Sequence, residues 1–402
     1  MGVPRLGAVE MSELRALLTP EGLQLLDETR ATGIRDVARA VSRLRAAGHS
    51  ADLVSAVVGQ ARLRERAAVK FGPFAEQMLF TRAGLEQATR LEIAARHAGR
   101  FRDAGLGSVA DLGCGIGGDA LGFAGIGMRV LAVDADEVTA AIAAYNLAPF
   151  GDAVTVRHGR AEASDLASVE SVWLDPARRT GGHSETARVR AEDYTPSLDW
   201  AFALAGRLPT GIKLGPAFDR ELIPDDVEAQ WIGVDGSTIE LVLWSGTLAR
   251  PGVARAALVV RSGVANELTS MTDAEDEPVR ELGAFVHEPE GAVIRARLIG
   301  DVARSLEAGM LAPGIAYLTG DAAVTSPFVS TFRVRETLPA DVKGLGKALR
   351  DRGIGRLEIK KRGVDIDPAK LRTQLKLRGD EEATLLVTRR GGRRLAILAD
   401  RV

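Results

Sequence analysis

Val109–Asp136, with the sequence VADLGCGIGGDALGFAGIGMRVLAVDAD, is the stretch that decides the fold. A short apolar run is followed by four glycines, Gly113, Gly115, Gly117 and Gly118, and a second apolar run ends on Asp134. Glycine allows the backbone to turn sharply and to come close to a ligand. The order of strand, glycine-rich loop, helix and strand predicts a nucleotide-binding α/β unit, in which an acid at the position of Asp134 binds ribose hydroxyls.

The glycine loop departs from the G-x-G-x-x-G pattern of dinucleotide sites, in which amides at a helix N-terminus hold a pyrophosphate. Asp111 instead stands at the end of the first strand. A carboxylate at that place repels a pyrophosphate but suits a cationic ammonium or sulfonium group. A domain of the NAD-binding type and a purely structural glycine turn are the alternatives.

The loop and its flanking acids resemble motif I of the class I S-adenosylmethionine-dependent methyltransferases. The resemblance implies that Asp111 lies near the methionine end of the cofactor, that the loop from Gly113 through Gly115 to Gly117 passes under it, and that Asp134 binds the ribose hydroxyls. We expect further cofactor contacts from Ala135, Ala161, Glu162, Asp175 and Pro176. The implied cofactor is S-adenosyl-L-methionine. The implied fold is α/β and Rossmann-like, with a seven-stranded sheet that ends in an antiparallel hairpin.

Strand and helix patterns divide the chain into four predicted regions. These are a helical N-terminal domain at 1–105, the methyltransferase domain at 106–261, a connecting α+β region at 262–335 and a basic domain at 336–402. Further strands of the second region are predicted at 153–158, 171–174 and 211–214, and Asp235-Gly236 between the apolar segments 231–234 and 238–244 is a strong hairpin signal. Residues 262–290 are predicted as a polar loop or junction, and strand-like alternation resumes at Ala292. The basic domain is predicted as helix, strand, helix, strand, strand.

Length and composition narrow the class of protein. A chain of 402 residues predicts two to three domains. No apolar run reaches about 18 residues, so no membrane-spanning helix is predicted, and the N-terminus lacks the pattern of a secretory signal. Cys114 is the single cysteine, which excludes an internal disulfide and a cysteine-based zinc site. We expect a soluble, cytoplasmic protein without a metal, and the sequence leaves its oligomeric state open.

A second motif, WLDPARR at 173–179, ends the fourth predicted strand. Ligands of open α/β sheets bind beyond the carboxyl ends of the strands, so this motif is predicted to face the glycine loop. Its place matches motif IV of nucleic-acid methyltransferases, with Ala177 and Arg178 where that motif usually has a second proline and an aromatic residue. We expect Asp175 to lie beside the reacting methyl group and to orient or deprotonate the nucleophile, with Arg178 and Arg179 as further catalytic residues. The alternative is a strand-terminating turn followed by two surface arginines.

Three further predictions concern residues in or near these motifs. Tyr194 or His183 could stack on a base in place of the missing aromatic residue. Gln87 and Thr89, in the segment GLEQAT before the first strand, are candidate cofactor contacts, although ordinary helix-face positions explain them equally well. Cys114 lies in the cofactor loop, so methylation of pyrimidine C5 through a cysteine nucleophile is not expected.

Positive charge is concentrated at the C-terminus. Residues 341–402 hold 17 Lys and Arg against 9 Asp and Glu, a net charge of +8, and since the whole chain carries −2, residues 1–340 carry −10. Such a module is expected to meet a polyanion. The predicted RNA-binding cations are Lys360, Lys361, Arg362, Arg372, Lys376 and Arg378. A solvated, arginine-rich surface is the alternative.

Together, these motifs resemble the bacterial class I methyltransferases that carry a C-terminal THUMP-like domain, over most of the chain. The resemblance implies a methyltransferase that acts on a base in structured RNA, such as transfer or ribosomal RNA. Two rival functions remain: methylation of a small molecule or a protein, and a catalytically silent RNA-binding protein that keeps the cofactor fold. Asp111, Asp134 and Asp175 favour a catalytic protein over a silent one, because a silent domain has no need for all three.

Overall fold

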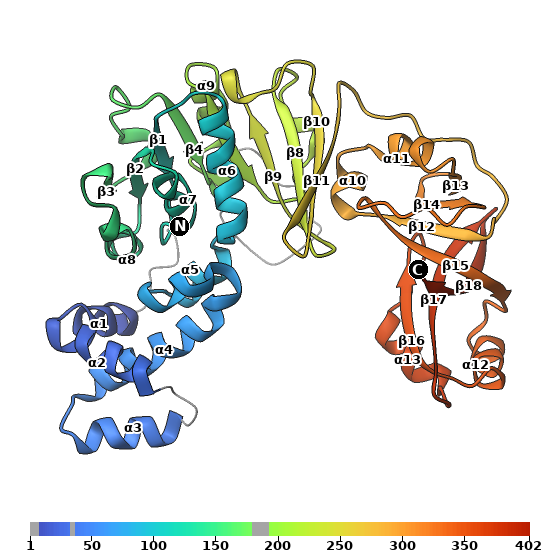
Figure 1. Cartoon of the computed structure of the whole chain (residues 1–402), viewed down its shortest axis with the longest axis horizontal. Coiled ribbons are helices and arrows are strands. Elements are labelled where there is room, and N and C mark those ends of the chain that lie inside the picture. Colours follow the sequence, from blue (N-terminus) through green and yellow to red (C-terminus); the bar gives the residue numbers. More distant parts are fainter. Residues whose placement is uncertain (1–7, 33–36, 179–192) are drawn as a thin grey trace. The chain divides into compact units, whose positions relative to one another are not determined.

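The computed structural model describes residues 8–32, 37–178 and 193–402. The chain forms two compact units, which we describe separately (Figure 1). The first unit holds residues 1–214, 219–224 and 243–249, and the second holds residues 215–218, 225–242 and 250–402. None of the described helices has the length and apolar character needed to span a membrane.

The first unit begins with the helices that the apolar periodicity predicts. They are α1 (Ala8–Leu17), α2 (Pro20–Thr32), α3 (Val37–Ala46), α4 (Ala51–Phe71), α5 (Arg82–Gln87) and α6 (Leu91–Asp103), with the 3-10 helix η1 (Gly72–Gln77) after α4. Ser50 caps α4, because its hydroxyl accepts a hydrogen bond from the Leu53 N–H at 3.3 Å. Leu53, Val54 and Val57 lie on the buried face of α4, and α1, α2 and α3 all contact this helix. The N-terminal helices therefore pack around α4.

A parallel sheet follows, and its strand order brings the predicted motifs together. Its strands in this unit are β1 (Ser108–Leu112), β2 (Arg129–Asp134), β3 (Val154–His158), β4 (Ser171–Leu174) and β7 (Thr210–Leu214). They lie in the order β3-β2-β1-β4-β7, so the chain order reverses between β1 and β4, where open α/β sheets bind ligands. Leu112 is paired with Val133 of β2 and with Leu174 of β4. The residues that follow these three positions therefore leave the sheet at the same edge.

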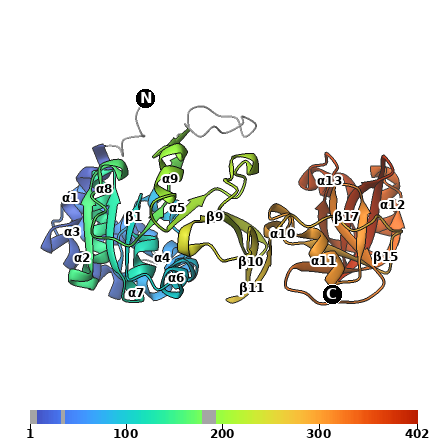
Figure 2. The same cartoon turned by 90° about the horizontal axis from the view of Figure 1, so that it is seen from above.

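Helices and aromatic side chains hold this sheet in place. Between the strands lie α7 (Gly118–Gly125), α8 (Glu137–Leu147) and α9 (Leu198–Ala205), with the 3-10 turns η2 (Ala148–Ala153) and η3 (Ala161–Ala163). Helices α6 and α7 lie side by side along the strands (Figure 2). The ring centroids of Phe101 and Phe123 are 4.9 Å apart, and those of Trp173 and Trp244 are 5.7 Å apart. A β-carbon at Gly211 would lie 2.7 Å from the Trp173 ring, so only glycine fits at this point of β7.

The first sheet is longer than the predicted seven strands. Its other strands are β8 (Glu228–Val234), β9 (Ser237–Trp244), β10 (Arg255–Arg261) and β11 (Val264–Ser270). Within the described residues it has nine strands in the order β11-β10-β8-β9-β7-β4-β1-β2-β3. The predicted hairpin between β8 and β9 is confirmed, with φ of 47° at Asp235 and 85° at Gly236. The prediction of a loop was wrong for β11, a polar strand with little hydrophobic alternation that is held by antiparallel pairing with β10.

The second sheet joins much of the expected connecting region to the basic module. Its strands are β12 (Phe285–Pro289), β13 (Gly309–Ala312), β14 (Ile315–Gly320), β15 (Val329–Leu338), β16 (Ile354–Lys361), β17 (Glu381–Arg390) and β18 (Arg393–Arg401). They lie in the order β13-β14-β12-β15-β18-β17-β16. The helices around it are α10 (Gly291–Arg295), α11 (Ile299–Ser305), α12 (Val342–Asp351) and α13 (Pro368–Leu375). The predicted order of elements in the basic module is confirmed.

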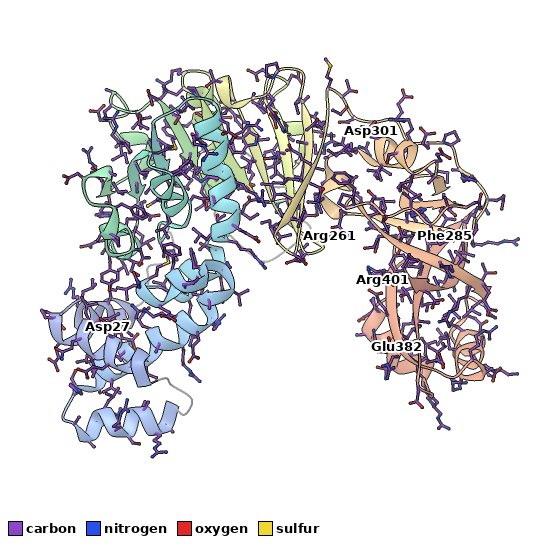
Figure 3. The ribbon with its side chains drawn as sticks, in the orientation of Figure 1. Asp27, Arg261, Phe285, Asp301, Glu382 and Arg401 are labelled. Carbon is purple, nitrogen blue, oxygen red and sulfur yellow. The ribbon has the colours of Figure 1, made fainter. Side chains whose placement is uncertain are left out.

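Two local expectations in this unit need correction. Strand-like alternation from Ala292 was misleading, because residues 291–295 form the short helix α10, in which Ala292 and Val293 are buried. Residues 285–289, predicted as part of a loop or junction, form β12, which pairs with β14 and β15. Arg261, labelled in Figure 3, ends β10 and pairs with Glu290, which precedes α10. Within the second unit, this ion pair joins β10 to the segment between β12 and α10.

Helices α12 and α13 cover one face of the second sheet. A single buried cluster joins them to it and includes Leu345, Leu349, Leu371, Leu375 and Leu385. The neighbouring Leu386 belongs to a separate buried cluster, together with Tyr317 and Phe332. Successive side chains of a strand point to opposite faces, so this second cluster lines the face opposite the two helices.

Asn146, near the end of α8, joins three parts of the first unit. Its Nδ2 donates to the carbonyl oxygens of Leu79 at 3.0 Å and Ile116 at 2.9 Å, and its Oδ1 accepts the Leu79 N–H at 2.7 Å. Asn146 is buried, so bulk water does not compete for these bonds. The side chain thereby fixes both the glycine loop and the segment before α5.

Replacing Asn146 by alanine leaves buried backbone groups without partners. We expect Asn146→Ala to lower the free energy of unfolding of the first unit by about 2–4 kcal/mol, measured by urea denaturation followed by tryptophan fluorescence. Ala144→Asn, at an exposed position of the same helix, should change it by less than about 1 kcal/mol. An Asn146→Ala protein as stable as wild type would contradict the role given to this network.

Candidate active site

Three glycines shape the loop after β1. Gly113, Gly115 and Gly117 have φ of 89°, 56° and 89°, which side chains rarely tolerate. A β-carbon at Gly113 would lie 2.7 Å from the carbonyl oxygen of Asp175, and one at Gly117 would lie 3.1 Å from Leu147. A β-carbon at Gly115 would meet nothing within 4 Å. The loop is therefore packed against β4 and α8 on two sides and open at Gly115, where a ligand can approach the backbone.

Asp111, the next-to-last residue of β1, is buried beside this loop. It is 1% exposed, and both carboxylate oxygens lack a hydrogen-bond partner among the described residues. Burial raises the pKa of Asp111 well above its ordinary value, and the charges of Asp119, Asp175 and Asp134 raise it further, while Lys213 opposes them. A buried carboxylate without partners carries a large desolvation cost unless it takes up a proton or meets a cation. Asp111 is therefore suited to receive a positively charged group.

Asp134 ends β2, and its side chain contacts the glycine loop. Its Oδ2 accepts the Gly115 N–H and its Oδ1 accepts the Asp136 N–H, both at 2.9 Å. Burial raises the pKa of Asp134, and these two backbone bonds oppose that rise. Each oxygen keeps a second lone pair, so the carboxylate can still accept two hydroxyl groups. Its geometry fits the ribose role expected from the sequence.

Other predicted cofactor residues lie nearby in sequence or at the same edge. Ala135 is exposed after β2, and Ala161 is buried at the start of η3. Glu162 pairs with Arg160 at 3.0 Å. Pro176 is buried after β4. Their contacts with a cofactor stay predictions.

Asp175 follows β4 directly, and its side chain is 36% exposed. Its backbone N–H donates to the Leu112 carbonyl oxygen at 3.2 Å, which places it beside the end of β1. Its Oδ2 lies 2.6 Å from the Lys213 Nζ. The predicted meeting of the two motifs at one sheet edge is thus present in the structure.

The chain after Asp175 forms β5 (Ala177–Arg178), which pairs with β6 (Tyr194–Thr195). Tyr194 is 5% exposed, so its ring is not open for stacking on a base in this structure. The side chain of Arg178, and Arg179 and His183 altogether, lie outside the described residues. Their catalytic or stacking roles stay predictions.

A buried polar network behind Asp175 was not anticipated from the sequence. Lys213, at the end of β7, donates to the Thr89 Oγ1 at 2.9 Å and lies 3.4 Å from the Asp119 Oδ2. Asp119, in the first turn of α7, also accepts from the Thr89 hydroxyl at 2.8 Å and contacts the His97 Nδ1 at 2.8 Å. Lys213 and His97 together with the Thr89 bond hold the pKa of Asp119 below its ordinary value despite its burial. The sequence features that could have pointed to this network are a lysine near the end of a buried strand, Lys213, and an acid within an apolar helix, Asp119.

Lys70 holds the segment that carries Thr89. Its Nζ donates to the carbonyl oxygens of Leu85, Glu86 and Ala88 at 2.7, 2.8 and 2.8 Å, which are the last carbonyls around α5. Burial lowers the pKa of Lys70, and the nearby cations lower it further. Lys70 thereby fixes the segment from which the Thr89 hydroxyl contacts Lys213 and Asp119. Gln87 is exposed, so a helix-surface position explains it in this structure.

Chemically, the site gathers acids around a single sheet edge. Asp111, Asp119, Asp134 and Asp175 lie close enough for their charges to influence one another. Within the described residues no group of three or more His, Cys, Asp or Glu is arranged to hold a metal ion. The expected cofactor carries an ammonium and a sulfonium group, and the unpartnered oxygens of Asp111 fit such a cation.

Two regions of the chain match described families. Residues 329–401 match the family described as THUMP domain-like, and residues 10–67 match a domain of unknown function. The first match covers β15 to β18 with α12 and α13, and the second covers most of α1, α2, α3 and most of α4.

Relatives were found by sequence and by structure. The chain is 34% identical over 338 residues to an uncharacterised S-adenosylmethionine-dependent methyltransferase of Mycobacterium tuberculosis, which covers 82% of this chain and 91% of that protein. The counterpart from a second strain of that species gives the same values. The crystal structure of a candidate methyltransferase from Porphyromonas gingivalis W83 has a TM-score of 0.69 and 21% identity, covering 98% of this chain and 97% of that one. At that identity the structural match shows a common fold.

Asp111 and Asp119 form a matched pair of buried aspartates, one without and one with partners. At pH values above the ordinary pKa of an aspartate, Asp111 is ionised in the unfolded chain but tends to keep its proton in the folded chain, because burial raises its pKa there. Asp111 therefore destabilises the folded state increasingly as the pH rises. Asp111→Asn should therefore raise the melting temperature of the cofactor-free protein, more at pH 8 than at pH 5. It should also weaken S-adenosylmethionine binding about tenfold or more in calorimetry, because the cation then faces a neutral amide.

Asp119→Asn is the control, and it should lower the stability of the folded protein rather than raise it. The lowered pKa of Asp119 means that its contribution is present above the ordinary value and is lost as pH falls. Its amide should lower the melting temperature at pH 8. If Asp111→Asn is less stable than wild type, or binds the cofactor as tightly as wild type does, the proposed role of Asp111 in holding the positive charge of the cofactor is wrong.

Proposed function

Because the chain belongs to the S-adenosylmethionine-dependent methyltransferases, with their class I Rossmann-like fold, we propose that it transfers the methyl group of S-adenosylmethionine to a base in structured RNA. The observation that carries this proposal is the exposed basic surface on the two helices of the C-terminal module. The THUMP domain-like match of that module supports it, since the resemblance links such modules to RNA-modifying enzymes.

Many cations of the module are paired with acids. The pairs are Arg335–Asp400, Arg352–Glu336, Arg356–Glu382, Lys360–Glu288, Arg362–Glu288, Arg390–Glu281 and Arg401–Glu358, and Arg401 and Glu382 are labelled in Figure 3. Lys360 and Arg362, two of the six predicted RNA contacts, therefore share the carboxylate of Glu288. We leave these two out of the proposed surface, because a phosphate would have to compete with Glu288 for them.

A second set of cations is exposed and has no ion pair among the described residues. We call it the helix-face patch, and its members are Lys343, Lys347, Lys361, Lys370, Arg372, Lys376 and Arg378. All but Lys361 lie on α12, on α13 or directly after α13, and Lys361 ends β16 on the same side of the sheet as the buried Ile359. Asp341 and Asp367 are occupied as helix caps by backbone N–H groups. The patch thus offers phosphate groups a set of exposed cations that form no salt bridge in the described residues.

The proposed cofactor contacts follow from the site geometry. Asp111 would receive the ammonium or the sulfonium charge, the open backbone at Gly115 would lie against the ligand, and Asp134 would accept the ribose hydroxyls. S-adenosylmethionine supplies an electrophilic methyl group, so the protein mainly has to align an acceptor with it. Asp175 lies at the exposed end of this edge and would orient the acceptor or take its proton.

Methyl transfer to RNA tests the proposal directly. The substrate would be RNA from cells that lack the gene, incubated with S-adenosylmethionine carrying a labelled methyl group, and nucleosides would be separated by mass spectrometry. We expect one labelled nucleoside with wild type and none with Asp175→Ala, whose cofactor affinity should stay within about tenfold of wild type. Label on proteins or small metabolites but not on RNA would favour the rival substrates. Normal transfer by Asp175→Ala would reduce Asp175 to a turn residue.

The helix-face patch predicts a salt dependence of RNA binding. Affinity for bulk transfer RNA should fall steeply with potassium chloride, and Arg372→Gln, Lys376→Gln and Arg378→Gln together should flatten the log–log slope by about two, at about 0.7 for each lost phosphate contact on single strands. The matched control replaces Arg389, Arg393 and Arg394, three exposed arginines at the β17–β18 turn, by glutamine. An equal loss in both triple variants would mean that net charge acts, and that the patch is not the RNA surface.

A further inference from the structure

Lys213 is the one residue in the described part of the site that touches both the exposed and the buried acids. Its side chain is 11% exposed, and its Nζ lies 2.6 Å from Asp175 Oδ2 and 3.4 Å from Asp119 Oδ2. A third bond runs to the Thr89 Oγ1 at 2.9 Å. An ammonium group has three N–H donors, and these three oxygens match them in number. Lys213 is thus fixed between β4, α7 and the segment before α6.

Charges around Lys213 are mostly negative. The acids that act on Asp111 are Asp119, Asp175 and Asp134, and Lys213 is the cation that acts against them. The other nearby lysine, Lys70, already donates to three carbonyl oxygens and forms no ion pair in the described part of the chain. His97 contacts the other carboxylate oxygen of Asp119, Oδ1, and its ring lies 4.4 Å from that of Trp173. Among the described residues, Lys213 is therefore the cation that forms salt bridges with the acids of this edge.

We propose that Lys213 is a positioning residue that acts through Asp175 and Asp119, and that by offsetting their charge it limits how strongly the site prefers the sulfonium cofactor to the neutral thioether product. S-adenosylmethionine and S-adenosylhomocysteine differ by one methyl group and one positive charge on sulfur. Acids near the sulfur favour the charged form, and a cation held among them weakens that preference. This inference rests on the cofactor class and is independent of the RNA substrate.

The same ammonium group holds Asp175 in place. The side chain of Asp175 is more exposed than that of Asp119, and its salt bridge to Lys213 is shorter than the one between Asp119 and Lys213. A carboxylate at the end of a strand can adopt several rotamers, and a partner fixed by two further oxygens selects one of them. Lys213 would therefore set both the charge of the site and the direction in which Asp175 points.

Calorimetric titration with S-adenosylmethionine and with S-adenosylhomocysteine tests the proposal without any methyl acceptor. Lys213→Met keeps the length of the side chain and removes its charge, so the ratio of the product Kd to the cofactor Kd should rise about threefold to tenfold. Lys213→Arg keeps the charge and should leave the ratio near wild type. Asp175→Asn removes an acid and should lower the ratio.

Lys70→Met is the structural control, because Lys70 holds the same segment through carbonyl oxygens alone. It should weaken both ligands by similar factors. If Lys213→Met also weakens both equally and leaves the ratio unchanged, Lys213 is only a structural residue and the proposal fails. Should Lys213→Met not fold, Lys213→Gln, which also removes the charge, must raise the ratio in the same way. Failure of RNA methylation would leave the outcome of these titrations untouched.

Discussion

The burial of an unpartnered carboxylate at the end of β1 is the constraint on which the rest of the site depends. Asp111 is 1% exposed, and neither of its oxygens has a hydrogen-bond partner in the described residues. Such a group weakens the fold unless it is protonated or faces a cation. Lys213 forms salt bridges with the neighbouring Asp119 and Asp175, whereas Asp111 itself has no salt bridge in the described residues. We propose that the positive charge of S-adenosylmethionine supplies the missing partner of Asp111, so that binding would relieve part of the desolvation cost of this carboxylate.

A second set of contacts connects the N-terminal helices to this edge. Gln60 on α4 forms two hydrogen bonds with the backbone of Phe80, at 2.6 and 3.0 Å, and Arg64 donates to the Met78 carbonyl oxygen at 2.8 Å. Further along the same helix, Lys70 holds the carbonyls around α5. Three side chains of α4 therefore hold the backbone of the segment between residues 78 and 88. A change in the N-terminal helices would reach the glycine loop through this segment.

Local patterns were enough to predict the frame of the fold. The predicted bounds of β4 agree with the structure, and Asp111, Asp134 and Asp175 meet at one edge because β2, β1 and β4 are parallel neighbours whose carboxyl ends lie together. The polar network was not predictable in this way. Lys213 and Thr89 are 124 residues apart, so their bond depends on tertiary packing and leaves no local signal.

Ion pairing in the folded protein also decides which cations of the basic module are available to bind a polyanion. Six cations of one local run looked equivalent in sequence, and only the sheet brings Glu288 of β12 against Lys360 and Arg362. β11 was missed for a related reason, because backbone pairing with β10 holds a strand whose side chains carry little hydrophobic alternation. In both cases the deciding contact lies between segments that are distant in sequence or weak in pattern.

Proton release on cofactor binding is the measurement that tests this account most directly. Asp111 carries a raised pKa in the free protein, and a cation placed beside it must lower that pKa and release a proton. Calorimetry of S-adenosylmethionine binding across the acidic to neutral pH range, in pairs of buffers that differ in ionisation enthalpy, gives the number of protons released at each pH. We expect a net release from wild type and a smaller or absent release from Asp111→Asn. Equal proton release from the two proteins would contradict the claim that the cofactor supplies the missing partner of Asp111.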